Sequence, residues 1–420
     1  MSETLTSNTI RIRMYRIGFG DCFLLSLPVS AAAFRHILVD CGVHAKGNIG
    51  TLDEITDNIA AVTNRKLAVV IATHAHQDHI SGFDPKKFGQ FEIGEVWMPW
   101  TENPDDPQAV KLKKKHVALT QQLADHFAAQ ARSSATIGKA RAASSAAVAN
   151  LVLNKTSLKA LHAGFSVNAR VRFFKAGDVV KKFDDVPGLS VRFLGPPTDK
   201  KFLAKMDPPA GHSYLRLDSA GKRVEVVNQL RPFADKWAVK PSFPEMKNLR
   251  LSTAEKKRIQ KDVAEGSLDA LAFALDNAIN NTSLVTLFSF RGQTLLFPGD
   301  AQYGNWAAWL AQDGSADILS SINFLKVAHH GSVNATPTDA LEKMSTGKFA
   351  AMVSTQSTPW PSIPRIPLID RLKQQTKNKV IRSDSLALQN FPQAPKGPNL
   401  AKVPKGFHKG DFWYDYVIKL

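Results

Sequence analysis

The residues most suited to chemistry lie in one short segment, Thr73-His74-Ala75-His76-Gln77-Asp78-His79. It follows the apolar, β-branched run Leu67 to Thr73, which is typical of a strand buried on both faces. Imidazoles and carboxylates suit Zn²⁺, Mn²⁺ or Fe²⁺. In an extended loop His74 and His76 can point to one ion, while Asp78 and His79 reach a second. The spacing predicts a two-metal site at a strand end.

Two further groups of candidate ligands end predicted strands later in the chain. Asp300 closes the run Leu295 to Asp300, and the pair His329-His330 follows the run Phe324 to Ala328. Asp300 can bridge both ions, and one histidine of the pair can complete the second site. The sequence leaves open which of the two histidines binds.

Two bridged cations would perform hydrolysis without a protein nucleophile. They would lower the pKa of a bound water toward about 7 and direct the hydroxide at phosphorus or a carbonyl carbon. They would also neutralise the charge that develops on non-bridging oxygens. We expect Asp78, His79 and Asp300 to carry this catalysis.

The elements that must position these residues are mostly strands. Apolar and alternating runs predict strands at Thr9–Tyr15, Cys22–Pro28, His36–Asp40, Leu67–Thr73, Ala169–Lys175, Leu189–Leu194, Ser283–Phe290, Gln293–Phe297, Ile322–Ala328, Phe349–Ser354 and Lys379–Arg382. A hairpin turn is expected at Arg291-Gly292, and helices near Leu368–Gln375 and between Pro104 and Gly164.

Composition limits the class of protein. The chain has 420 residues, of which 44% are hydrophobic and 22% charged, which excludes a disordered, collagenous or coiled-coil protein. The formal charge is +17. This charge predicts a polyanionic substrate, most simply nucleic acid, although a basic surface can also serve solubility alone.

Cysteine usage and hydropathy predict a cytoplasmic protein. The chain has two cysteines, Cys22 and Cys41, too few for a disulfide framework. There is no apolar run of the length that a membrane span requires and no secretory leader pattern at the start. The sequence gives no indication of oligomeric state.

The motifs together resemble those of the metallo-β-lactamase superfamily, whose signature is HxHxDH followed by a distant Asp and His. Further segments match: Arg16 to Asp21 its DVGQGD-like opening, Ile37 to Gly42 its LxDxG strand, Asn280 to Val285 its NNxSLV segment, Pro298 to Asp300 its TGD element, and Leu325 to Ser332 its LKVGHHGS element. The last segments resemble the branch that includes the hydrolase domain of the competence DNA-uptake channel ComEC and a phosphorylcholine esterase.

This resemblance implies the fold and its boundaries. The family has an αβ/βα sandwich, two mixed sheets face to face with helices outside, and its metals lie along one sheet edge. We expect one domain over residues 1–420, with a core at 9–100, 166–198 and 270–390. Residues 101–165 and 199–269 would be basic helical insertions, and 391–420 a C-terminal extension.

The chain departs from the family pattern at three places. Most relatives supply a third histidine to the first ion where this chain has Asn280 and Asn281, so the first site is expected to bind more weakly, to take Mn²⁺ or to complete its shell with water. The opening carries Arg16 in place of an acid. Trp360 precedes Pro361 where the branch often has a histidine that protonates the leaving group.

Several nearby residues have two interpretations. Asp21 and Asp40 can accept hydrogen bonds from ligand imidazoles or merely cap turns. Asn280 and Asn281 can face the site or satisfy loop backbone, and Ser332 can bind a substrate phosphate or cap the turn after Gly331. Cys41 fits a buried structural thiol better than a ligand.

The leading functional hypothesis is a phosphodiesterase or nuclease with two Zn²⁺ or Mn²⁺ ions. Phosphates would then lie along the basic runs Lys111 to Lys115, Lys200-Lys201 and Lys256-Lys257-Arg258, each of which can also be a solvated helix face. The alternative is a hydrolase of small esters such as lactones, thioesters or phosphorylcholine. A third hypothesis is a non-catalytic binding module.

Overall fold

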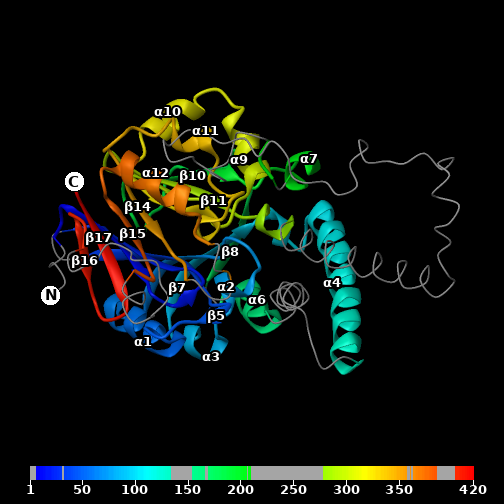
Figure 1. The fold of residues 1–420 in the computed structure, drawn as a ribbon. Helices are drawn as coiled ribbons and strands as arrows, with labels where there is room; N and C mark the ends of the chain where they lie inside the picture. Colours follow the sequence, from blue (N-terminus) through cyan, green and yellow to red (C-terminus); the bar gives the residue numbers. More distant parts are fainter. Residues whose placement is uncertain are drawn as a thin grey trace, which may run out of the picture.

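The computed structural model describes residues 6–30, 33–133, 154–165, 169–205, 207–209, 278–356, 360, 363–385 and 403–420. Two large mixed sheets lie face to face, and helices cover their outer faces (Figure 1). This arrangement agrees with the metallo-β-lactamase sandwich that the motifs predict. Most of the expected insertion at 199–269, including Lys256-Lys257-Arg258, lies outside the described residues.

The first sheet has the strand order β16-β17-β1-β3-β4-β6-β7-β8. Its strands are β1 (Thr9–Tyr15), β3 (Cys22–Pro28), β4 (Phe34–Cys41), β6 (Lys66–Ile71), β7 (Glu92–Pro99), β8 (Arg170–Phe174), β16 (Phe407–Lys409) and β17 (Trp413–Lys419). Strands β4, β6, β7 and β8 are parallel, and the remaining pairs are antiparallel. A separate two-stranded sheet joins β2 (Gly18–Phe19) to β5 (Ala45–Lys46).

The second sheet has the order β15-β14-β13-β12-β11-β10-β9. Its strands are β9 (Val179–Val180), β10 (Leu189–Gly195), β11 (Val285–Phe290), β12 (Gln293–Phe297), β13 (Phe324–Lys326), β14 (Ala350–Val353) and β15 (Val380–Arg382). The predicted hairpin turn between β11 and β12 is confirmed. Arg291 and Gly292 adopt φ of 46° and 79°, as a two-residue type I′ turn requires.

The main core lies between the two sheets. Strand β1 alternates so that Ile10, Ile12 and Met14 face it. Aromatic rings fill the space across the sandwich, and the ring centroids of Phe23 in β3 and Phe297 in β12 lie 5.8 Å apart, edge to face. These contacts hold the two sheets at a fixed separation, and therefore also the loops at their edges.

Helices on one outer face are α1 (Leu52–Thr63), α2 (Gln77–Ile80) and α3 (Pro85–Phe88), and those on the other are α9 (Tyr303–Leu310), α10 (Ser315–Ser320), α11 (Thr338–Leu341) and α12 (Ile366–Thr376) (Figure 1). Helix α1 begins with a capping box formed by Thr51 and Glu54. Beside the sandwich stand α4 (Pro107–Ser133), α6 (Lys155–His162) and α7 (Lys200–Leu203). Two short 3₁₀ helices, η1 (Trp100–Glu102) and η4 (Ala328–Gly331), complete the elements.

The first sheet extends beyond the segments that the sequence pattern singled out. Strands β1, β3 and β12 have the predicted bounds, whereas β7 was not identified. The expected C-terminal extension supplies β16 and β17, and β17 pairs with β1 from Thr9 opposite Lys419 to Tyr15 opposite Trp413. Pairing across nearly the whole chain length leaves no local sequence signal, which is why this role was not predicted.

None of the helices in the described ranges combines the length and the apolar character that crossing a bilayer requires.

Candidate metal centre

The metal-ligand motif occupies the loop between β6 and the short helix α2. His76 is the N-cap residue of α2, and Asp78 and His79 lie in its first turn. Asp40, at the end of β4, accepts hydrogen bonds from both the backbone N–H and the hydroxyl of Thr73, each at 2.7 Å. The carboxylate of Asp40 therefore fixes the start of the loop against the neighbouring strand.

The second sheet contributes Asp300 and His330. Asp300 follows β12, and His330 lies in η4 directly after β13. His329, His330 and Gly331 all have positive φ, at 46°, 53° and 83°. Such a run is costly for residues with a Cβ atom, and strain of this kind is commonly found at functional sites. A Cβ atom on Gly331 would meet Pro364 at 2.7 Å, so this turn accepts glycine best.

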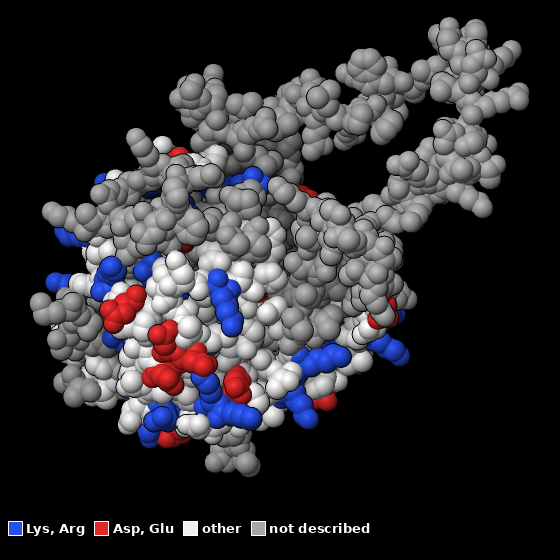
Figure 2. All heavy atoms as spheres, turned by 60° about the horizontal axis from the view of Figure 1, so that its bottom comes forward, with Lys and Arg blue, Asp and Glu red and all other residues white. Residues whose placement is uncertain are grey.

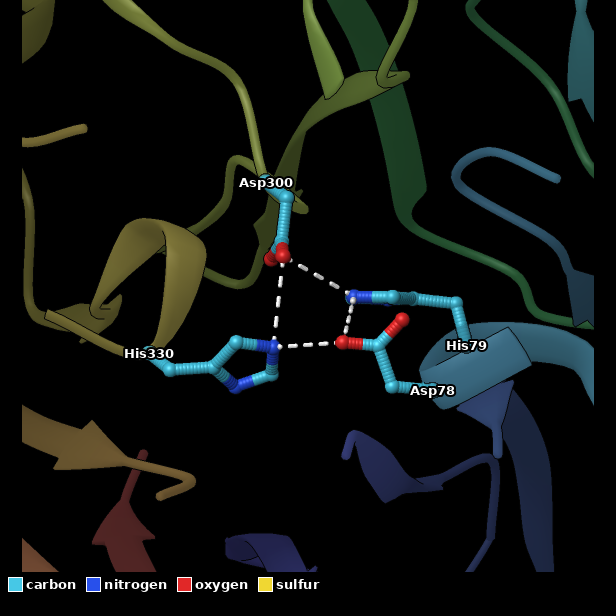
Figure 3. A group of neighbouring side chains, drawn as sticks. All are labelled: Asp78, His79, Asp300 and His330. Carbon is cyan, nitrogen blue, oxygen red and sulfur yellow. Dashed lines mark hydrogen bonds and ion pairs between the residues drawn. The ribbon is translucent and has the colours of Figure 1, made fainter. Parts of the chain in front are cut away.

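Asp78, His79, Asp300 and His330 point toward one another from the two sheets (Figure 3). His79 Nε2 lies 3.1 Å from Asp300 Oδ2 and 3.9 Å from Asp78 Oδ2. His330 Nε2 lies 3.1 Å from Asp78 Oδ2 and 3.2 Å from Asp300 Oδ2. One ligand atom from each residue falls within 4.8 Å of all the others, and all four residues are buried. We call this group the four-residue cluster.

The far nitrogen of each cluster histidine has a hydrogen-bond partner. His79 Nδ1 lies 2.7 Å from Asp40 Oδ2, and His330 Nδ1 lies 2.8 Å from the carbonyl oxygen of Ser354. In neutral imidazoles these contacts place the proton on Nδ1 and direct the lone pair of Nε2 into the cluster. Asp40 therefore orients a candidate ligand as well as its loop.

A buried lysine completes the surroundings of the cluster. Lys326 Nζ lies 3.1 Å from Asp300 Oδ1, contacts Asp21 Oδ2, and donates a hydrogen bond to the carbonyl oxygen of Gly299 at 2.9 Å. Burial alone would lower the pKa of Lys326, but the carboxylates of Asp21 and Asp300 outweigh burial and raise it. The ammonium group is therefore charged and balances two buried carboxylates.

The remaining predicted ligands adjoin the four-residue cluster. His74 Nε2 lies 3.0 Å from His76 Nδ1, and the His74 ring lies 4.1 Å from the His79 ring. Asn280 interacts with His76, and its Nδ2 lies 3.4 Å from His329 Nε2. Asn280 thus lies beside the histidines assigned to the first ion, and His329 lies on that side as well.

Asn281 and Ser332 make structural contacts. Asn281 Nδ2 donates to the carbonyl oxygens of Leu203 and Lys205, at 3.2 and 2.8 Å, so it holds the end of α7. Ser332 donates its hydroxyl to Asn334 Oδ1 at 3.0 Å and its backbone N–H to His329. Cys41 is fully buried, as expected of a structural thiol.

The metal-binding and catalytic roles of the predicted site residues remain predictions.

Burial and neighbouring charges act in opposite directions on the pKa values of the cluster residues. Burial opposes the charge of His330, but Asp300 and Asp21 outweigh it and raise the pKa of His330 to about 10. Burial likewise disfavours the charge of Asp78, yet His79 and His330 lower its pKa. Burial lowers the pKa of His76 to about 4. His76 is therefore neutral near pH 7, which is the form that binds metal.

Unpaired polar atoms test whether the cluster fits a metal. Asp78 Oδ1 is buried and has no hydrogen-bond partner in the part of the chain that the structure describes, and His79 Nε2 there makes only ion-pair contacts with Asp300 and Asp78. Buried polar atoms nearly always have a partner. Imidazole nitrogens and carboxylate oxygens are the donors that Zn²⁺, Mn²⁺ and Fe²⁺ accept. The residues therefore fit divalent metal ions.

Basic residues flank the site at α4 and α7. Lys200 and Lys201 on α7 are exposed, as are Lys111, Lys114 and Lys115 on α4. Lys201 pairs with Asp199 at 3.1 Å, and Lys113 pairs with Glu102 at 2.6 Å. Gln108 at the start of α4 donates to the carbonyl oxygen of Thr198 just before α7, so the two helices begin side by side. Asn281, which holds α7, directly follows Asn280 at the site.

The face at the bottom of Figure 1 carries charges of both signs, unlike the lysine-rich surface of α4 and α7. Figure 2 shows Lys and Arg there interleaved with Asp and Glu rather than gathered into one patch. One example joins α3 to α1, where Lys87 Nζ lies 2.5 Å from Asp53 Oδ1. The formal charge of +17 therefore does not make every face of the molecule basic.

Sequence reasoning missed Lys326 as a site residue. A lysine within the otherwise apolar run Phe324 to Ala328 was the available signal, because a charged side chain is rarely buried without a partner. It also missed the ring contacts of Phe19 with His330 and of Trp360 with Phe19. These contacts join segments far apart in the chain and leave no local pattern.

Comparison with known proteins supports the fold family. Residues 33–111 match the model of the metallo-beta-lactamase superfamily, whose members are generally metal-dependent hydrolases or related enzymes. The match contains β4, β6, β7 and the HxHxDH loop, and the described sheets agree with the sandwich of that superfamily. No curated protein matches the chain.

Two similar solved structures are forms of one enzyme. The chain is 10% identical to CmlA, a diiron beta-hydroxylase from Streptomyces venezuelae, covering 91% of this chain and 53% of that one, with a TM-score of 0.37. A single-substitution variant of CmlA gives 11% identity, coverage of 90% and 53%, and a TM-score of 0.32. The chain spans about half the length of these structures.

Proposed function

We propose that the protein is a metal-dependent phosphodiesterase that acts on nucleic acid or nucleotides. The observation that carries the proposal is the four-residue cluster, whose candidate ligand atoms come from both sheets and lie within 4.8 Å of one another. The superfamily match supports a metal-dependent hydrolase. Preference for a phosphodiester rests on the basic residues beside the site.

Two divalent cations, when bound, would activate water and neutralise charge on a phosphate. Asp78, His79 and His330 would hold one ion, and His74 and His76 the other. Asp300 would contact both. The amide of Asn280 offers the first site a weaker donor than imidazole, so we expect that site to lose its ion first. Zn²⁺ and Mn²⁺ are the ions that this donor set favours.

The protein's own residues prepare the site for this role. Asp40 and the Ser354 carbonyl orient His79 and His330 through their Nδ1 atoms. Lys326 occupies Asp300 Oδ1 and leaves Oδ2 facing the two histidines. The candidate ligand side chains are therefore held in position by the protein alone, which would reduce the reorganisation that metal binding and reaction require.

The basic residues support an anionic polymer as substrate. Exposed lysines on α4 and α7 lie on the side where Asn281 connects α7 to the site. Lysine ammonium groups bind phosphates without reading sequence, and each contact releases counterions. A chain of phosphates held on α7 would thus be close to the cluster.

The test is cleavage of single- and double-stranded DNA and RNA by the purified protein with Mn²⁺ or Zn²⁺. We expect cleavage by the parent protein and none above background by Asp300→Asn or by the double variant Asp78→Ala/His79→Ala. Asp313→Asn is the matched control, because Asp313 is exposed and lies in the turn between α9 and α10. Metal content of each variant is measured alongside.

Three outcomes separate the hypotheses. Cleavage that is lost in the cluster variants but kept in Asp313→Asn supports the proposal. Hydrolysis of small esters by the parent, without cleavage of any phosphodiester, would overturn it in favour of a small-ester hydrolase. A protein that binds no metal and hydrolyses neither class would indicate a non-catalytic binding module.

A further inference from the structure

Three aromatic contacts lead from the four-residue cluster toward the surface. The Phe19 ring lies 4.3 Å from the His330 ring, and the Trp360 ring lies 4.6 Å from the Phe19 ring. The His44 ring lies 4.9 Å from the Trp360 ring. Phe19 belongs to β2 and His44 immediately precedes β5, so the small β2–β5 sheet positions both rings beside Trp360.

Exposure changes along the group. Phe19 is 3% exposed and His330 is 1% exposed, whereas Trp360 and His44 are each partly exposed. Trp360 therefore offers ring surface to a ligand while Phe19 supports it from below. A single buried ring separates Trp360 from a candidate metal ligand.

The charge around Trp360 selects the kind of ligand. Neither residues 43–52 nor residues 354–369 contain an acidic residue, and their charged members are Lys46 and Arg365. Asp21, the nearest carboxylate in the Phe19 segment, is buried and paired with Lys326. The charged residues of these two segments are basic, which favours a planar ring joined to phosphates over a quaternary ammonium group.

We propose that the exposed ring surface of Trp360, flanked by His44, is a stacking subsite for a nucleobase next to the scissile phosphate. The proposal rests on the proposed function and adds to it a reason for acting on nucleotides rather than on simple phosphodiesters. Stacking of a base on an aromatic side chain tolerates every base, so this subsite confers affinity for nucleic acid without sequence preference.

Binding measured without turnover tests the subsite. The background is Asp300→Asn, and the probes are a fluorescently labelled oligothymidylate and an abasic oligomer of the same length, followed by anisotropy. Base–aromatic stacking makes the base-containing probe about 5- to 150-fold tighter. We expect Trp360→Ala to bring the ratio of the two probes' dissociation constants close to one. Trp360→Phe should retain most of the preference for the base-containing probe. Val179→Ala, an exposed apolar residue on β9, is the control.

Turnover gives a second, independent measurement. Thymidine 5′-(p-nitrophenyl phosphate) and methyl p-nitrophenyl phosphate share a leaving group and differ in the nucleoside. Trp360→Ala should raise the KM for the thymidine ester by about the factor by which it weakens binding of the base-containing probe. The KM for the methyl ester should stay unchanged, which also shows that the variant folds. p-Nitrophenyl phosphorylcholine serves as the cationic comparison.

The outcomes distinguish failure of the subsite from failure of the proposed function. Cleavage of phosphodiesters with a binding ratio that Trp360→Ala does not change would overturn the subsite and leave the function standing. A ratio that depends on Trp360, in a parent protein that cleaves no phosphodiester, would support base binding and overturn the function. A loss confined to the phosphorylcholine ester would overturn the assignment to nucleobases.

Discussion

The two carboxylate oxygens of Asp300 contact different neighbours. Oδ1 lies 3.1 Å from Lys326 Nζ, while Oδ2 lies 3.1 Å from His79 Nε2 and 3.2 Å from His330 Nε2. An ammonium group only donates hydrogen bonds. Lys326 therefore holds Oδ1 and leaves Oδ2 for the cluster, which makes it a positioning residue.

Replacing Lys326 with Met should destabilise the protein. Asp21 and Lys326 are 1% and 2% exposed, and removing one partner of a buried ion pair costs about 3–5 kcal/mol. We expect the free energy of unfolding of the metal-free protein, measured in urea, to fall by that amount. The double variant Lys326→Met/Asp21→Asn should recover much of the loss. An unchanged urea midpoint in the single variant would contradict this account.

Asp40→Asn should weaken metal binding without unfolding the protein. The amide still accepts from the Thr73 backbone, but its NH₂ group cannot accept the Nδ1 proton of His79. Loss of such a partner typically lowers metal affinity about 10- to 100-fold. Competition with a chelator measures the affinity, and Asp313→Asn serves as control. Unchanged affinity would show that Asp40 only fixes the loop.

The stability of the metal-free protein should depend on pH through His330. Its pKa rises to about 10 in the folded state because Asp300 and Asp21 outweigh burial, against about 6.5 when unfolded. A raised pKa contributes stability that is complete below about pH 6.5 and is lost as pH rises through about 10. Asp78 and Asp300 have lowered pKa values, so their contribution is lost as pH falls below about 3.8.

Urea unfolding in chelator at several pH values measures this effect. We expect stability to decline between about pH 6.5 and 10, and less steeply in His330→Asn. Metal affinity should change in the opposite direction over the same range, because an ion must displace the proton of His330. A metal affinity that does not change with pH would exclude His330 as a ligand.

At the scale of elements, β17 ties the end of the chain to its beginning. Arg13 in β1 donates to both oxygens of Asp415 in β17, each at 2.7 Å, and both side chains are 2% exposed. Asp415→Ala should therefore lower the free energy of unfolding by about 3–5 kcal/mol. The exposed Asp411 offers the control Asp411→Ala, for which we expect little change in the urea midpoint. Equal effects of both substitutions would contradict a special role for the buried pair.

Sequence patterns predicted those elements whose signals are local. Thr9–Tyr15 and Gln293–Phe297 have the predicted bounds because alternating or apolar runs end at clear turn residues such as Arg291-Gly292. Strand β17 has a suitable run of aromatic and β-branched residues, yet its role depends on a partner about 400 residues away in sequence. Pairing at that separation depends on tertiary packing, which a local pattern does not contain.

The candidate site likewise contains residues with a local sequence signal and residues whose role depends on distant contacts. HxHxDH, Asp300 and the histidine pair could be named as candidate ligands because imidazoles and carboxylates at strand ends form a recognisable spacing. The choice between His329 and His330 depended on a left-handed turn that directs one ring into the cluster and the other toward Asn280. Lys326 was missed because its partners, Asp21 and Asp300, come from two different sheets.

At the scale of the whole molecule, the basic helices should determine how salt affects nucleic-acid binding. We expect the affinity for single-stranded DNA to fall linearly with salt on logarithmic axes. The double variant Lys200→Gln/Lys201→Gln should reduce the slope by about one for each phosphate that the protein no longer binds. Anisotropy at several salt concentrations, in the Asp300→Asn background, measures both slopes.

The control is a second pair of exposed neighbouring lysines, Lys181 and Lys182, which follow β9 at the edge of its sheet. They line a separate cavity of about 530 Å³. Lys181→Gln/Lys182→Gln removes the same charge and should leave the slope close to that of the parent. Equal slopes for the two double variants would mean that only total charge governs binding.

The place of β17 beside β1 also sets an order of assembly during synthesis. Strand β1 lies between β17 and β3, so without the last strands it forms the edge of the first sheet. A ribosome adding roughly 5–20 residues per second needs about 20 to 80 s to proceed from residue 15 to residue 413. During that time the growing chain presents an open edge that can join another chain. We therefore expect the nascent protein to need chaperone protection far longer than a fold whose strands pair in order.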